Sequence, residues 1–190
     1  MARSLILVKH ALPTLDAAVP ARHWRLAPEG EAQSRRLARE LLDFQPFRLV
    51  CSREPKALRT AEIVAEELSL PVAQQAGLEE FDRPALPLLS PAEHASLNAP
   101  IFADPARRVL GEECGAGALE RFRAALAAAL ADTPEDHHLV AVTHGTVMAL
   151  LVAAHNRVDG FELWRRLACP SLVVLGLPEL ELLEVLDQVT

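Results

Sequence analysis

The chain has 190 residues, a length that fits one domain with a substantial hydrophobic core. Hydrophobic residues make up 51% of it and charged residues 24%, a balance that excludes global disorder. Its 19 basic and 26 acidic side chains leave a formal net charge of −7, which argues against nucleic-acid binding, and the aromatic content of 4% argues against platforms for base stacking.

No apolar run approaches the roughly 18 residues that a membrane helix needs. The apolar stretch near the N-terminus, residues 5–8, is too short for a signal peptide, so we expect a cytoplasmic protein with no membrane partner. The cysteines Cys51, Cys114 and Cys169 are odd in number and widely spaced, which fits neither a disulfide framework nor a metal site.

The first half of the chain alternates short apolar runs with runs of helical periodicity, the pattern of an α/β domain. Residues 5–8 are apolar at every position and predict a strand that is buried on both faces. A helix is predicted over residues 28–43, a strand over 48–51 and a second helix over 55–68. Residues 71–73 predict a brief third strand.

Residues 81–113 hold several prolines and show little periodicity. We interpret them as a partly helical insertion, or lid, over a site, since so long a connection is unusual in a compact domain. The remaining predicted elements are a helix over 119–130, a strand over 139–142 with a helix directly after it, and a closing hairpin of strands over 171–176 and 182–186. We therefore expect one domain that covers residues 1–190.

The residues that end the predicted strands are chemically distinctive, and ligands of open α/β sheets bind beyond the carboxyl ends of the strands. In chain order they are Lys9, His10, Arg53, His144, Gly145 and Thr146. Gly145 and Thr146 also open a helix, whose N-terminus attracts anions. Two histidines with basic neighbours beside a helix N-terminus favour phosphoryl transfer, because a neutral histidine can attack phosphorus while cations neutralise its oxygens.

A single histidine at a strand end is more often a solvated loop residue than a catalyst. The equivalent positions of His10 and His144 strengthen the functional interpretation. The other histidines show no metal-ligand spacing and are interpreted as surface residues: His23, His94, His137, His138 and His155.

Six short segments follow one another along the chain in a recognisable order. They are residues 5–11 (L-I-L-V-K-H-A), 24–33 (W-R-L-A-P-E-G-E-A-Q), 51–64 (C-S-R-E-P-K-A-L-R-T-A-E-I-V), 78–82 (L-E-E-F-D), 111–112 with Glu120 and Arg121, and 142–145 (V-T-H-G). Together they resemble the motifs of the histidine phosphatase superfamily, the phosphoglycerate-mutase-like proteins.

This resemblance implies a three-layer α/β/α sandwich with a mostly parallel central sheet. It also implies a phosphomonoester hydrolase of the histidine acid phosphatase type, with no metal or organic cofactor, that acts on a small phosphorylated substrate or binds inorganic phosphate. His10 would be the nucleophile that forms a phosphohistidine, His144 would stabilise the transferred group, and Glu80 would protonate the leaving oxygen. Glu79 is the alternative acid if the alignment is shifted by one residue.

The chemistry of these roles sets two expectations for protonation. Glu80 has to hold a proton near pH 7, so we expect partial burial to raise its pKa. His10 has to be neutral, with one ring nitrogen oriented by a partner such as a backbone carbonyl.

The chain departs from the family pattern at the phosphate clamp. Lys9 and Lys56 stand where the family has two arginines, and Ala11 stands where it has glycine; these two are the only lysines among the 19 basic side chains. The replacement of arginine by lysine either is a neutral substitution that keeps the positive charge or reflects a pocket that is adapted to compact ammonium groups. Arg53 could supply the planar, bidentate guanidinium that the lysines lack, and Thr146 could add a hydroxyl contact to phosphate. The competing interpretation is that these residues have ordinary surface and capping roles.

Two rival functions remain open. A catalytically degenerate family member would bind an anionic ligand or partner without turnover, and the lysine substitutions favour it, whereas the retained histidines and Glu80 oppose it. A phosphoglycerate mutase is less favoured, because such mutases are usually longer. The sequence does not specify the oligomeric state or the physiological substrate. We expect residues 81–113 to line the leaving-group side of the site, with Arg83, His94, Arg107 and Arg108 as polar residues.

Overall fold

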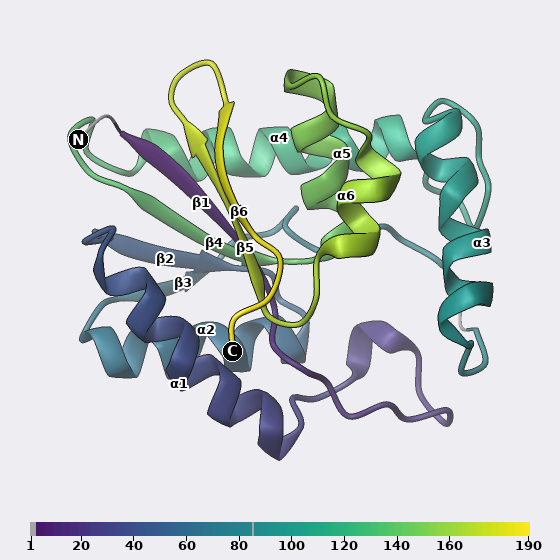
Figure 1. Ribbon diagram of the computed structural model, residues 1–190, viewed down its shortest axis with the longest axis horizontal. Coiled ribbons are helices and arrows are strands. Elements are labelled where there is room, and N and C mark those ends of the chain that lie inside the picture. The colour runs from purple at the N-terminus through teal and green to yellow at the C-terminus, as the bar shows by residue number, and fades with distance from the viewer. Residues whose placement is uncertain (1–2, 85) are drawn as a thin grey trace.

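The computed structural model describes residues 3–84 and 86–190, and a six-stranded sheet in the order β3-β2-β4-β1-β5-β6 forms its centre (Figure 1). The strands are β1 (Ser4–Lys9), β2 (Arg48–Cys51), β3 (Val72–Gln74), β4 (Leu139–Thr143), β5 (Ser171–Gly176) and β6 (Glu181–Leu186). The strands β3, β2, β4 and β1 pair in parallel, β5 pairs with β1 in the antiparallel direction, and β6 pairs with β5 in the antiparallel direction. The prediction of an α/β fold with a mostly parallel sheet is confirmed.

Six α-helices and one short 3-10 helix surround the sheet in the described part of the chain. They are η1 (Ala21–His23), α1 (Pro28–Leu42), α2 (Pro55–Leu68), α3 (Pro91–Ala103), α4 (Gly115–Ala131), α5 (Gly145–His155) and α6 (Gly160–Arg166). None of these helices is long and apolar enough to cross a bilayer.

The protein has two hydrophobic cores, one on each face of the sheet, and the side chains of β1 point alternately into one and the other. Ile6 and Val8 pack with residues of α1 and α2 on one face, whereas Leu5 and Leu7 pack with residues of α4 and α5 on the other. Figure 1 shows the corresponding layers, with α1 and α2 below the sheet and α4, α5 and α6 above it. All four side chains are fully buried, as expected for a parallel strand covered on both faces.

Helix α5 is the most deeply buried helix, since every residue from Gly145 to Val152 is buried. It lies between the sheet and its neighbours α4 and α6, so it needs no polar face. It begins two residues after the end of β4, which places its N-terminus at the carboxyl edge of the sheet.

The structure differs from the predicted elements in several places, among them the helix predicted over residues 119–130, which begins at Gly115. The third strand covers Val72–Gln74, one residue later than predicted. The region 81–113 contains one helix, α3, whose N-terminus is closed by a reciprocal capping box between Ser90 and Glu93; Ala85 lies outside the described residues. Helix α6 was not predicted, because seven residues are too few to show a clear period.

Helix α3 is attached to the body of the domain through α6. Phe102 on α3 lies 6.0 Å from Phe161 on α6, ring centroid to centroid. Gly160 permits this approach, because a Cβ there would lie 2.9 Å from the Cβ of Ala153 and 3.0 Å from Cδ1 of Phe102. The predicted lid region therefore packs on the same side of the sheet as α5.

Candidate active site

His10 follows β1 directly and is 7% exposed. Its backbone N–H donates to the carbonyl of Thr143 at 3.0 Å, which ties the ends of β1 and β4 together. The ring Nδ1 lies 2.8 Å from the carbonyl oxygen of Ala11. Because a carbonyl can only accept, the shared proton belongs to Nδ1, and Nε2 carries the lone pair.

His144 follows β4 and is the N-cap residue of α5. Its ring centroid is 5.1 Å from that of His10, so the structure brings together the two predicted histidines (ring planes at 64°). Its Nε2 lies 2.9 Å from the hydroxyl oxygen of Ser52. Its Nδ1 is buried and has no hydrogen-bonding partner within residues 3–84 and 86–190, an uncommon state for a buried polar atom.

Both imidazole rings are held in the neutral form. Burial lowers the pKa of His10 well below its usual value, and the neighbouring His144, Lys56 and Lys9 lower it further. Burial and the charge of Lys56 lower the pKa of His144 to about 3. The expectation of a neutral His10 oriented by a backbone carbonyl is thereby met.

The two clamp lysines are in different electrostatic situations. Lys56 is buried, donates to the carbonyl of Ala21 at 2.9 Å and forms a short ion pair with the carboxylate of Glu54. Lys9 donates to the carbonyl of Leu167 at 2.6 Å and has no carboxylate oxygen within 4.0 Å in the described part of the chain. The charge of Lys56 is therefore offset inside the protein, and that of Lys9 is not.

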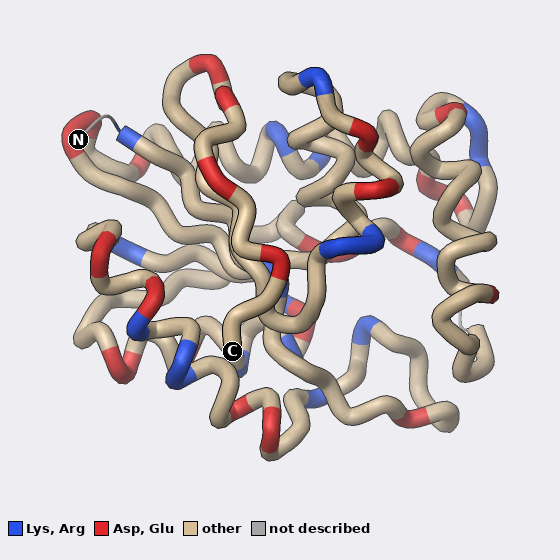
Figure 2. Tube along the Cα trace, in the orientation of Figure 1, with Lys and Arg blue, Asp and Glu red and all other residues tan. Residues whose placement is uncertain are grey.

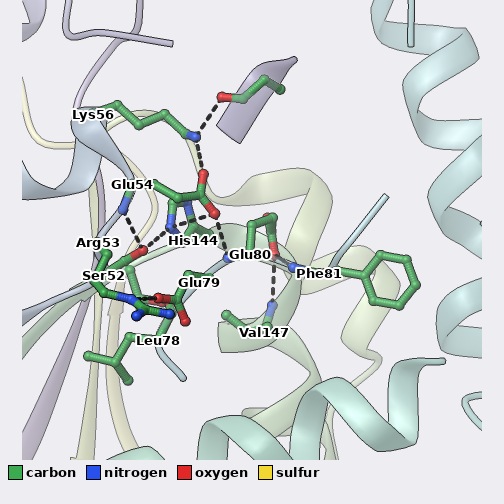
Figure 3. A network of polar contacts seen from close by, with 12 residues as sticks. Ser52, Arg53, Glu54, Lys56, Leu78, Glu79, Glu80, Phe81, His144 and Val147 are labelled. Carbon is green, nitrogen blue, oxygen red and sulfur yellow. Dashed lines mark hydrogen bonds and ion pairs between the residues drawn. The ribbon is translucent and has the colours of Figure 1, made fainter. Parts of the chain in front are cut away.

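Glu54 links three parts of the site, and sequence reasoning missed it. Its Oε1 accepts from the backbone N–H of Glu80 at 2.9 Å and lies 3.5 Å from Nε2 of His144, while its Oε2 pairs with Lys56 (Figure 3). The available signal was a carboxylate just after a predicted strand end, two residues before a clamp lysine. It is 8% exposed, which identifies it as a component of the site interior.

Glu80 caps the N-terminus of α5. Its carboxylate accepts from the backbone N–H groups of Phe81 (2.8 Å), Thr146 (3.1 Å) and Val147 (3.3 Å). Burial raises its pKa, but the opposing effects of His144, Arg83 and these N–H groups are larger, so the pKa is lowered overall. The expectation that the pKa of Glu80 is raised overall is therefore wrong for the ligand-free site, although burial acts in the expected direction.

The alternative acid, Glu79, forms a different pair. Its Oε1 accepts from Nε of Arg53 at 2.6 Å and its Oε2 accepts from the N–H of Gly77 at 2.7 Å. Burial raises the pKa of Glu79, but the hydrogen bond from Arg53 and other contacts lower it overall. Arg53, predicted to bind phosphate, has a side chain that is 59% exposed, and it does not line the cavity that opens beside the two histidines.

A cavity of about 600 Å³ opens beside the two histidines. The predicted residues in its wall are Lys9, His10, Lys56, Glu80, His144 and Gly145. Thr146 is fully buried behind it and reaches it only through Glu80 and Arg83.

Other residues of the cavity wall were not predicted, among them Trp24, Trp164 and Arg165. Arg83 and His94, expected to be polar residues of the leaving-group side, also line the cavity, although His94 had been interpreted as a surface residue as well. The ring of His94 lies 5.2 Å from that of Trp164. Trp24 follows η1 directly, and the other side chains come from the lid region and α6, so only folding brings them to the strand ends. Within the described residues, no group of three or more His, Cys, Asp or Glu is placed to hold a metal ion.

Comparisons with known proteins agree with this fold. A family model described as histidine phosphatase superfamily (branch 1) matches residues 5–178. The chain is similar in structure to a mycobacterial glucosyl-3-phosphoglycerate phosphatase (23% identity, 100% of each chain, TM-score 0.76). It is also similar to YhfR of Bacillus stearothermophilus (21% identity, 100% of this chain and 98% of the other, TM-score 0.77).

A third similar structure is a phosphoserine phosphatase mutant from Entamoeba histolytica in complex with phosphoserine. Its identity is 16%, 98% of each chain is covered and the TM-score is 0.74. No curated protein sequence matches the chain.

The first prediction concerns the buried ion pair. Replacing Glu54 with Gln should lower the free energy of unfolding by about 3 kcal/mol, because it leaves the ammonium of Lys56 buried without its counter-charge. The double replacement Glu54→Leu with Lys56→Met should recover most of this loss. Urea unfolding followed by circular dichroism measures both effects.

Glu162 provides the control, since its pair with Arg165 is exposed (side chains 56% and 54%). Glu162→Gln should cost less than about 1 kcal/mol. An equal loss in the free energy of unfolding for Glu54→Gln and Glu162→Gln would show that burial does not increase the contribution of the Glu54–Lys56 pair to stability.

The second prediction concerns pH. An unfolded histidine takes up a proton as the pH falls through about 6.5, whereas His144 stays neutral down to a pKa of about 3. The unfolded state then binds more protons, so acidification from pH 7.5 to 5.5 should cost about 1.4 kcal/mol of stability for this histidine. His144→Asn should remove that part of the pH dependence, and the exposed His23→Asn should not. An unchanged pH dependence in His144→Asn would contradict the neutral, buried ring.

Proposed function

The chain belongs to the histidine phosphatase superfamily (branch 1), and on that premise we propose that it hydrolyses small phosphomonoesters through a phosphohistidine on His10. The observation that carries the proposal is the Nδ1–H of His10 bound to the Ala11 carbonyl, which leaves the Nε2 lone pair free on a neutral ring at the wall of the cavity. The phosphatase names of the structural neighbours are consistent with this chemistry.

In the first step, Nε2 of His10 attacks phosphorus and the ester P–O bond breaks. The leaving oxygen takes a proton from Glu80 as the N–P bond forms. In the second step, water attacks the phosphohistidine, Glu80 accepts the proton of that water, and the N–P bond breaks to release inorganic phosphate. The same carboxyl group thus acts as acid and then as base.

Glu80 must gain a proton before the first step, because its pKa is lowered in the ligand-free site. A phosphoryl dianion bound beside His10 and His144 would bring negative charge close to Glu80. Negative charge nearby raises the pKa of a carboxyl group. We therefore propose that the substrate itself converts Glu80 into the acid that its reaction requires.

The phosphoryl group would be held mainly by His144 and Lys9. The ammonium of Lys9 lacks an internal counter-charge, and its end group lies close to the start of α5, since a Cβ on Gly145 would be 3.5 Å from the Lys9 Nζ. Lys56 would contribute less, because Glu54 offsets its charge. This difference between Lys9 and Lys56 supports a pocket that is adapted to lysine, rather than a neutral exchange of arginine for lysine.

A second candidate is a family member that binds phosphate without turnover. The short ion pair between Lys56 and Glu54 favours it, because a buried internal carboxylate already occupies a cation that the family uses for phosphate. The ionised state of Glu80 in the ligand-free site points the same way.

The third prediction separates these candidates. The wild type should hydrolyse p-nitrophenyl phosphate, and His10→Ala should reduce kcat by about a thousandfold or more, because no other group at this position can form the covalent intermediate. His23→Asn, at an exposed position, should keep the wild-type rate. The assay should be paired with calorimetric titration of inorganic phosphate into both variants.

Hydrolysis that survives in His10→Ala would refute the phosphohistidine mechanism. No hydrolysis by the wild type, together with phosphate binding by both the wild type and His10→Ala, would establish the binding function instead.

A further inference from the structure

Arg83 is a cation of the main cavity that the proposed reaction does not use. Its guanidinium donates through Nη2 to Oδ1 of Asn98 at 3.1 Å and to Oγ1 of Thr146 at 3.3 Å. Its Nη1 lies 3.2 Å from Nε2 of His94. The residue is half-buried and forms part of the cavity wall.

The guanidinium of Arg83 has no carboxylate oxygen within 4.0 Å among the described residues. Other arginines near the site are paired: Arg165 with Glu162 at 3.0 Å, Arg53 with Glu79 at 2.6 Å and Arg121 with Glu113 at 2.8 Å. A half-buried charge that contacts only neutral acceptors is costly, and a paired one is not. The cavity therefore presents a cation with an unused capacity for an anion.

Arg83 is also held in a fixed position. Asn98 is fully buried, and its Nδ2 donates to the carbonyl of His94 at 2.7 Å, which directs its Oδ1 toward Arg83. Helix α3 contributes this amide but no Lys or Arg of its own, as Figure 2 shows. Helix α5 contributes the hydroxyl of Thr146 as a second acceptor. Preorganised donors bind anions at lower entropic cost than mobile ones do.

The position of Arg83 relative to Glu80 indicates which part of a substrate it meets. Both side chains bind the same residue, because Thr146 gives its N–H to Glu80 and accepts at Oγ1 from Arg83. Glu80 is the proposed proton donor to the leaving oxygen, so Arg83 lies on the leaving-group side of the reaction. The transferred phosphoryl group is assigned to His144 and Lys9 instead.

We propose that the natural substrate is a phosphomonoester whose leaving group carries a second anionic group, a carboxylate or another phosphate, and that Arg83 binds this group. The inference rests on the proposed phosphatase function and specifies its substrate class. Arginine suits the role because it stays charged at every working pH, and in the described part of the chain its Nε–H and one N–H of Nη1 have no hydrogen-bonding partner and can donate to an anion.

The two tryptophans of the cavity wall are compatible with such a substrate. Trp24 donates its indole N–H to the carbonyl of Asp16 at 2.9 Å, and Trp164 stacks on Phe161 with ring planes at 10°. Both side chains are thereby fixed, and they offer apolar surface to the carbon skeleton between the two anionic groups.

An anion on Arg83 would also act on the acid. The positive charge of Arg83 is one of the causes that lower the pKa of Glu80. Neutralising that charge would ease the protonation that the first step requires. A doubly anionic substrate would therefore gain in the chemical step as well as in binding.

The test compares substrates that differ only in the second anionic group. For the carboxylate, the pair is 3-phosphoglycerate and glycerol 3-phosphate; for the phosphate, it is fructose 1,6-bisphosphate and fructose 6-phosphate. The wild type should favour the doubly anionic member of at least one pair by about tenfold or more in kcat/KM, ~1.4 kcal/mol. The pair that shows the preference identifies the anion.

Arg83→Gln should reduce this preference to within about threefold, and Arg83→Lys should retain part of it because the charge remains. Arg165→Gln is the matched control in the same wall, and it should keep the wild-type preference, since Arg165 is already paired with Glu162. Thermal melts of the variants report whether the loss of the Asn98 contact affects folding.

The outcomes are distinct. If the wild type hydrolyses both members of each pair equally well, the proposed phosphatase function stands and the role of Arg83 is refuted, whether or not Arg83→Gln folds. An equal loss for both members in Arg83→Gln would show that Arg83 binds the transferred phosphoryl group, which also overturns the proposal. If the wild type hydrolyses no phosphomonoester, the proposed function itself fails.

Discussion

The parallel pairing of β1 with β4 is the constraint on which the site depends. It places His10 and His144 at adjacent strand ends, and the hydrogen bond from the His10 N–H to the Thr143 carbonyl fixes their relative height. The centroids of the two rings are then 5.1 Å apart, with the ring planes at 64°, in an interior that keeps both rings neutral. The proposed nucleophilic role of His10 therefore rests on burial at a parallel sheet edge and calls for no activating base.

Charge balance is the second organising feature of the site. A buried carboxylate, Glu54, compensates Lys56 and reaches both His144 and the backbone of Glu80. The positive potential available to a ligand is concentrated on Lys9 and Arg83, two residues of the cavity wall that have no carboxylate oxygen within 4.0 Å among the described residues. A site with two separate cations is suited to a ligand with two separate anionic groups, whereas two adjacent clamp arginines would suit one phosphoryl group.

Much of the fold and part of the site were predictable from local patterns. Apolar runs and helical periods located the main elements, and the residues that follow those runs identified His10 and His144. Glu54 was not recognised, because its importance comes from Glu80 and His144, which are far away in the sequence. Arg83 was expected on the leaving-group side, but its contacts with Asn98 and Thr146 form only on folding. The pKa of Glu80 was predicted in the wrong direction for the same reason: the N–H groups of α5 and the charge of Arg83 outweigh burial only after folding.

The most direct test of this account is a crystal structure of the protein with orthovanadate, which adopts the geometry of a phosphoryl group under nucleophilic attack. The account predicts vanadium bonded to Nε2 of His10, with vanadate oxygens in contact with His144 and Lys9. Vanadate bonded to another residue, or bound away from the two histidines, would contradict it.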